Sequence, residues 1–270
     1  MGCDGACAAQ HAKMTARLSG MALWAVLALA GPAGVADARP AVPNPQELLA
    51  RSDVGSFAPT SFRARLLLKP PPPRESREIE VWRSGEAKTL VRFLNPKEQG
   101  KYLLRLGGQL WLVAPGAREP VRISASYRLY GGATLDEVLG TRLAREYAVE
   151  SASEEEEAGG KVVVLELRAK AEHLLFPEVR YVVREATERP IRAEYRLRSG
   201  RPATAVEFVE WNDRGSRYAR RLRVRDLLRK GALTEVQVLE LQERSVPESL
   251  FDLHDSSARR ALDAGMALPP

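Results

Sequence analysis

Few side chains in this sequence have the type and spacing that catalysis requires. Of the three histidines, only His173 and His254 lie beyond the first forty residues. Both cysteines, Cys3 and Cys7, lie within those forty residues. No histidine or cysteine spacing typical of a transition-metal site occurs, nor does a Gly-x-Ser-x-Gly or a phosphate-binding glycine loop. We therefore expect no catalytic residue, no metal site and no cofactor. An esterase-like enzyme is the weakest interpretation, because a nucleophile–base pair is lacking.

Charge and aromatic content argue against nucleic acid as a partner. The 270-residue chain has a formal net charge of +6 and a pI of about 9.5, but its basic residues are scattered and aromatic residues make up only 6%. A nucleic-acid-binding arm concentrates basic charge, and single-strand binding relies on stacking aromatic residues. The acidic run Glu154–Glu157 next to Gly159-Gly160 is more typical of a solvated hairpin tip than of a metal site.

The first 38 residues are typical of an export leader. Basic residues precede an apolar run, Met21–Ala30, and Ala36-Asp37-Ala38 supplies an A-x-A cleavage site. We expect export to the periplasm with cleavage near Ala38, which leaves a domain without cysteines that can fold without disulfides. Two alternatives stay open: a translation start at Met14, and retention of the apolar run as a single membrane anchor.

In most of the remaining chain, the hydrophobicity pattern has a period of two residues. Apolar residues alternate with charged ones in about eleven short segments at hairpin spacing, with no regular alternation of helices. This pattern predicts one antiparallel meander sheet over residues 39–255, with one apolar and one charged face, followed by a tail over 256–270. Twelve residues that we assign to the apolar phase are the candidates for lining a shared surface: Phe62, Leu66, Val81, Val91, Phe93, Leu104, Leu106, Val163, Leu165, Tyr195, Phe208 and Leu222.

Only two or three short helical segments are available to cover that face. Asn44 and Pro45 open the first, residues 45–50, and Thr134 with Glu137 forms a capping box in the second, residues 133–139. Residues 247–253 form the third. Such a long sheet must curl or close. Either these segments complete an ordinary core, or their cover is incomplete and leaves a cavity.

Several weak motifs in a fixed order resemble a known family. They are Phe93-Leu94-x-Pro96, Gly100-x-x-x-Leu104, Leu110-Trp111-Leu112-x-x-Pro115 and Arg122-Ile123-Ser124, followed by segments at residues 176–191 and 246–251. In this order they resemble the bacterial outer-membrane lipoprotein-sorting proteins, in the superfamily of the LolA and LolB carriers. The similarity covers roughly residues 46–253, and residues 125–132 depart from the family pattern.

The resemblance implies an unclosed antiparallel β-barrel of about eleven strands around a short helical lid. It also implies a monomeric periplasmic carrier, whose hydrophobic cavity binds the acyl chains of a lipoprotein or lipid and shuttles them toward the outer membrane. An inner-membrane transporter of the resistance-nodulation-division or ABC type is a candidate partner. The alternative is an accessory protein that binds an envelope transporter without binding lipid.

Overall fold

The structure is a computed structural model of the chain. It describes residues 44–54, 59–124, 126–139, 142–172, 174–212, 218–229 and 232–266, all within the unit Arg39–Pro270. The expected leader, with its cysteines and its cleavage site, lies outside the described residues, as does His173. None of the helices described is long and apolar enough to cross a membrane.

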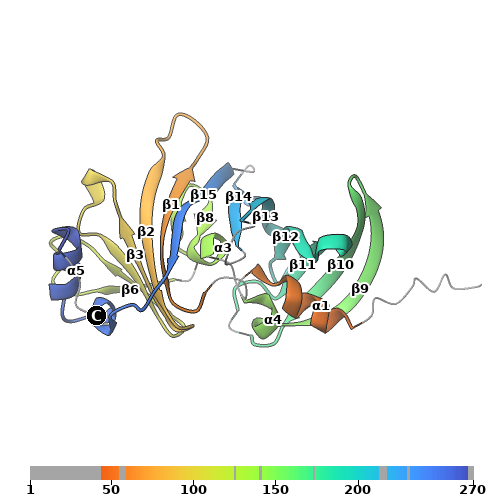
Figure 1. The fold of residues 1–270 in the computed structure, drawn as a ribbon, viewed down its shortest axis with the longest axis horizontal. Coiled ribbons are helices and arrows are strands. Elements are labelled where there is room, and N and C mark those ends of the chain that lie inside the picture. The colour runs from red at the N-terminus through yellow and green to blue at the C-terminus, as the bar shows by residue number, and fades with distance from the viewer. Residues whose placement is uncertain are drawn as a thin grey trace, which may run out of the picture. The chain divides into compact units, whose positions relative to one another are not determined.

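One antiparallel sheet of thirteen strands dominates the described part of the chain (Figure 1). Its spatial order is β6-β5-β4-β3-β2-β1-β15-β14-β13-β12-β11-β10-β9, so two hairpin meanders meet where the first strand pairs with the last. The strands are β1 (Phe62–Lys69), β2 (Arg77–Ser84), β3 (Lys88–Phe93), β4 (Tyr102–Leu106), β5 (Gln109–Val113), β6 (Val121–Ile123), β9 (Tyr147–Glu157), β10 (Gly160–Ala169), β11 (Glu178–Arg184), β12 (Arg189–Arg196), β13 (Pro202–Trp211), β14 (Ala219–Asp226) and β15 (Ala232–Glu243).

The predicted fold class is confirmed: the protein is mainly β, and its antiparallel sheet is open, with β6 and β9 at the two edges. The sheet has more strands than the expected eleven or so. The acidic run predicted as a hairpin tip belongs to the edge strand β9, where Glu155 pairs with Arg180 at 3.0 Å and Glu157 pairs with Arg192. Cross-strand ion pairs of this kind leave no apolar alternation to mark the strand.

Short elements lie on the face of the sheet that we call the inner face. They are α1 (Pro45–Ser52), the hairpin of β7 (Arg128–Tyr130) and β8 (Ala133–Thr134), α3 (Leu135–Leu139) and α4 (Leu143–Glu146). The predicted caps are confirmed: the Asn44 side chain accepts from Glu47 N at 3.2 Å, and Thr134 and Glu137 form the capping box. Short 3₁₀ turns complete the fold: η1 (Pro96–Glu98), η2 (Glu185–Thr187) and η3 (Glu248–Phe251).

The larger hydrophobic core lies between the inner face and these elements. A second cluster lies on the opposite, outer face, where Trp82, Leu90 and Leu104 pack under η3 and α5 (Ser257–Asp263). The residues expected to form a tail therefore include a packed helix, because Ala258 and Leu262 are buried in this cluster. Tyr102 fixes the helix further by donating its hydroxyl proton to Arg259 O at 3.1 Å.

Candidate functional site

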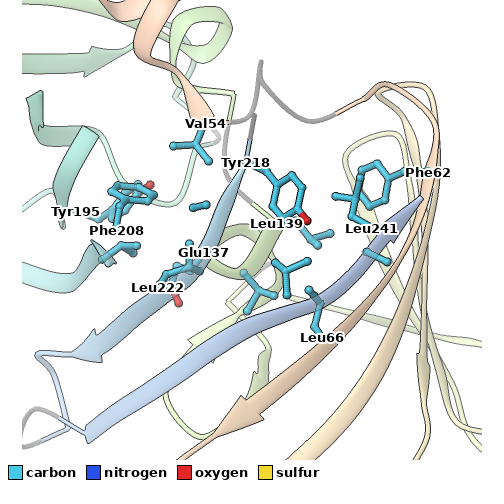
Figure 2. Close-up of a pocket in the computed structure, with 15 residues that line it drawn as sticks. Val54, Phe62, Leu66, Glu137, Leu139, Tyr195, Phe208, Tyr218, Leu222 and Leu241 are labelled. Carbon is cyan, nitrogen blue, oxygen red and sulfur yellow. The ribbon is translucent and has the colours of Figure 1, made fainter. Parts of the chain in front are cut away.

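An apolar cavity of about 60 Å³ lies on the inner face, beneath α3 (Figure 2). Its wall comes from five neighbouring strands in the middle of the sheet, β12, β13, β14, β15 and β1, and its cover from α3 and the end of the α1 segment. The lining residues are Val54, Phe62, Ala64, Leu66, Glu137, Val138, Leu139, Tyr195, Val206, Phe208, Tyr218, Ala219, Leu222, Val238 and Leu241.

The structure divides the twelve predicted lining residues into three groups. Phe62, Leu66, Tyr195, Phe208 and Leu222 line the cavity. Five others belong to the same inner-face core without reaching the cavity: Val81, Val91, Phe93, Val163 and Leu165.

The other two, Leu104 and Leu106, were assigned to the wrong face. Both belong to the outer-face cluster with Trp82, and the apolar residue of β4 that faces inward is Leu103. Strand β4 reads Tyr-Leu-Leu-Arg-Leu, so it offers apolar side chains in both phases. With α5 covering its outer side, this part of the sheet is buried on both faces, and alternation no longer distinguishes them.

The lining residues on β15 were not among those predicted from the sequence. Val238 and Leu241 both face the cavity although their numbers differ in parity, because a β-bulge shifts the β1–β15 register between Arg65 and Leu66. One extra residue on one strand reverses the facing of every residue beyond it. The cover residues Val138 and Leu139 were also missed, although the capping box had located their helix.

The hairpin before α3 fixes the position of this helix over the cavity. Arg128 forms an ion pair of 3.1 Å with Asp226, which is fully buried in β14. Gly132 N donates to Thr234 Oγ1 at 3.1 Å. Gly131 has φ +60°, and a Cβ there would lie 2.3 Å from Thr234 Oγ1, so only glycine allows this approach.

Glu137 places one carboxyl group in this apolar lining. Its Oε2 accepts from Thr134 N at 2.7 Å, whereas its buried Oε1 has no hydrogen-bond partner among the described residues. Burial raises the pKa of Glu137, and hydrogen bonding by Thr134 only partly offsets this effect. Removal from water disfavours the charged form, so the carboxyl group holds its proton more tightly than a solvated one.

The cavity as it stands holds only a few water-sized groups, far fewer than a long acyl chain contains. A longer guest therefore requires α3 or neighbouring side chains to move aside. The lining is apolar apart from Glu137 and the hydroxyl groups of Tyr195 and Tyr218. In the part of the chain that the structure describes, no group of three or more histidine, cysteine or acidic side chains could hold a metal ion, and His254 is exposed.

A family model with the description "-like: Uncharacterized protein" matches residues 85–255, more than half of the chain. The chain belongs to this family. The region of this chain that the family model matches runs from the β2–β3 turn to just beyond η3. It therefore includes α3 and most of the strands that line the cavity. None of the curated proteins matches the sequence.

Solved structures identify the fold. A LolA superfamily protein from Nitrosomonas europaea is 22% identical, with a TM-score of 0.68 over 77% of this chain and 96% of its own. An outer membrane lipoprotein-sorting protein domain from Vibrio parahaemolyticus is 19% identical, with a TM-score of 0.63 over 81% and 96%. A DUF1329 family protein from Desulfovibrio piger is 16% identical, with a TM-score of 0.65 over 77% and 95%. The resemblance found in the sequence is thereby confirmed at the level of fold, which is that of the LolA superfamily.

Proposed function

We propose that this protein is a periplasmic carrier that holds the acyl chains of a lipid or lipoprotein and passes them toward the outer membrane. The observation that carries the proposal is the apolar cavity on the inner face, which five strands line and which the short helix α3 and the end of the α1 segment cover. The LolA superfamily fold supports it, as does a solved structure whose name refers to lipoprotein sorting.

The composition of the cavity suits an acyl chain. Each methylene group removed from water contributes about 0.8 kcal/mol, so the site needs apolar area more than polar contacts. Of the fifteen lining residues, Glu137 alone carries a formal charge, and burial favours its neutral form.

A carrier must also release its cargo, and α3 offers a mechanism. Val138 and Leu139 already contact the surface that an acyl chain would cover. Displacing them exposes apolar area of the helix, which offsets part of the free energy gained from the cargo. The net affinity is therefore lower than the contact area of the cargo alone would give.

Native mass spectrometry tests the proposal. The full chain is produced with its leader in a Gram-negative host and purified from the periplasm without detergent. We expect mass adducts of acyl-chain size that delipidation removes and that return on incubation with lipid. A protein that carries no adduct and regains none after incubation with fatty acid, lysophospholipid or diacylglyceryl lipopeptide would contradict the proposal. An inner-membrane transporter as donor, and the monomeric state, are further parts of this proposal.

A further inference from the structure

Three polar residues continue the inner face beyond the Phe62 end of the cavity, which Figure 2 shows opposite the Tyr195 end. Phe62 pairs with Arg83 across β1 and β2, Arg83 pairs with Thr89, and Thr89 pairs with Arg105. Directly paired residues of antiparallel strands share a face, with Cβ atoms about 5 Å apart. Arg83 therefore borders Phe62, and Arg105 lies two strands further along the same row.

Arg83 is a buried cation with little to balance it. Its side chain belongs to a residue that is 7% exposed, and its one hydrogen bond among the described residues runs from Nε to Gly85 O at 3.2 Å. No carboxylate in the described part of the chain forms an ion pair with it. Burial, with help from Arg142 and Arg105 and against the attraction of Asp136, lowers the pKa of Arg83 to about 10, so the group remains charged at neutral pH.

The surrounding charges do not remove this excess. Arg105 pairs with Asp136 on α3, and Arg142 shares Glu86 with Arg145. The buried Nε of Arg142 has no hydrogen-bond partner among the described residues. The third carboxyl group nearby, Glu146, has its pKa raised, mainly by burial, so its ionisation is disfavoured.

Arg142 thus has one buried donor without an acceptor among the described residues, and such a donor is costly unless an anion completes it. We propose that Arg83, Arg105 and Arg142 form an anion subsite that binds a phosphate group beside the Phe62 end of the cavity. Guanidinium groups suit this ligand because their planar N–H donors match phosphate oxygens in pairs.

The phosphate has two sources in principle, the headgroup of an acidic lipid and free phosphate. The lipid source rests on the proposed acyl-chain function, because the headgroup would then lie next to its own chain. A phosphate at this place would also compete with Asp136 for Arg105 and so weaken one tie of α3 to the sheet. Binding of an acidic headgroup and movement of the cover would then favour each other.

Two ligands that differ only in the phosphate test the proposal: 1-palmitoyl lysophosphatidic acid and 1-palmitoylglycerol, titrated as monomers into the delipidated protein. We expect the wild type to bind the phosphate-bearing ligand at least about tenfold more tightly, a difference that charge-assisted hydrogen bonds can supply. In Arg83→Gln the two affinities should fall within about twofold of each other. The matched control is Arg223→Gln on the outer face, where Arg223 Nη1 lies 3.9 Å from Glu207 Oε2. This variant should keep the wild-type ratio of the two affinities.

Arg142→Gln serves as the second variant if Arg83→Gln does not fold, and it should lower the ratio in the same direction. Inorganic phosphate alone separates the two sources: thermal stabilisation of the wild type at millimolar phosphate, absent in the variant, shows that the subsite takes free phosphate. Equal binding of both palmitoyl ligands by the wild type, or an unchanged ratio in both variants, overturns the subsite. If neither palmitoyl ligand binds, the acyl-chain function is wrong, and inorganic phosphate then tests the subsite by itself. Thermal stabilisation by phosphate that is lost in Arg83→Gln supports the subsite. If phosphate does not stabilise the wild type, the subsite is overturned.

Discussion

Thr134 and Glu137 hold each other at the start of the helix that covers the cavity: Thr134 N donates to Glu137 Oε2 at 2.7 Å, and Glu137 N donates to Thr134 Oγ1 at 3.4 Å. The carboxyl group thus has a structural role at one oxygen, while its other oxygen is buried and has no hydrogen-bond partner in the described part of the chain. This combination makes the stability of the cover sensitive to pH.

Replacement of Glu137 by Gln should change the pH dependence of stability. An acid whose folded pKa is raised favours folding fully below its unfolded pKa of about 4.5, and this contribution is lost as pH rises through the folded pKa. Gln keeps an acceptor for Thr134 N but cannot ionise. Relative to the wild type, Glu137→Gln should therefore gain stability between pH 4 and pH 8 in urea unfolding.

Glu207→Gln is the control for this comparison, because Glu207 lies on the outer face with 45% of its side chain exposed. It should leave the slope between pH 4 and pH 8 close to that of the wild type. Identical pH profiles for Glu137→Gln and the wild type would show that the Glu137 carboxyl group is not desolvated.

The ion pair between Arg128 and Asp226 should be the main attachment of the covering hairpin. Asp226→Ala leaves Arg128 without its partner and removes the acceptor for Leu228 N. Loss of one partner of a buried pair typically costs about 3 kcal/mol in unfolding free energy. Arg223→Ala, which changes an exposed pair, should cost less than about 0.5 kcal/mol. A similarly small loss of unfolding free energy in both variants, measured by urea unfolding, would show that the Arg128–Asp226 pair does not hold the hairpin in place.

The helix α5 should contribute to stability although the sequence predicted a tail there. Leu262→Ala removes a side chain buried against the outer-face cluster and should cost about 2 kcal/mol. Met266→Ala, just beyond the helix and 59% exposed, should cost less than about 0.5 kcal/mol. If thermal unfolding does not distinguish the two variants, the packing of α5 on Leu104 and Trp82 is wrong.

These cases show what the sequence can and cannot specify. The alternation in β1, β12 and β14 located Phe62, Leu66, Tyr195 and Leu222 correctly, because the opposite phase of each of those strands is mostly charged. In β4 the alternation was misleading, since Leu103 packs inward while Leu104 packs under α5, a helix that no sequence motif predicted.

Other features depend on contacts distant in the chain. The bulge that turns both Val238 and Leu241 inward results from pairing β1 with β15, about 170 residues apart, and no local signal encodes it. No sequence motif links Asp226 to Arg128, and only the assembled sheet brings the two residues together. Likewise, the row from Phe62 through Arg83 to Arg105 exists only after four strands align.

Export of the protein remains a prediction from the leader sequence. If cleavage follows Ala36-x-Ala38, the protein isolated from the periplasm should begin at or near Arg39 in N-terminal sequencing. A membrane-bound form that retains residues 21–30 would contradict a freely diffusing carrier.

The central claim, that the cavity under α3 accepts an acyl chain, is tested most directly by filling it. Val238 lines the cavity and is only partly buried, whereas the next residue, Leu239, is 43% exposed and is absent from the cavity lining. We measure the affinity of a fluorescent fatty-acyl probe for the delipidated wild type, Val238→Trp and Leu239→Trp, with thermal unfolding of each as the check on folding. The account predicts that Val238→Trp folds and binds the probe at least about tenfold more weakly, a loss of about 1.4 kcal/mol or more, while Leu239→Trp binds like the wild type. Equal binding by the two folded variants, or no binding by the wild type, would contradict it.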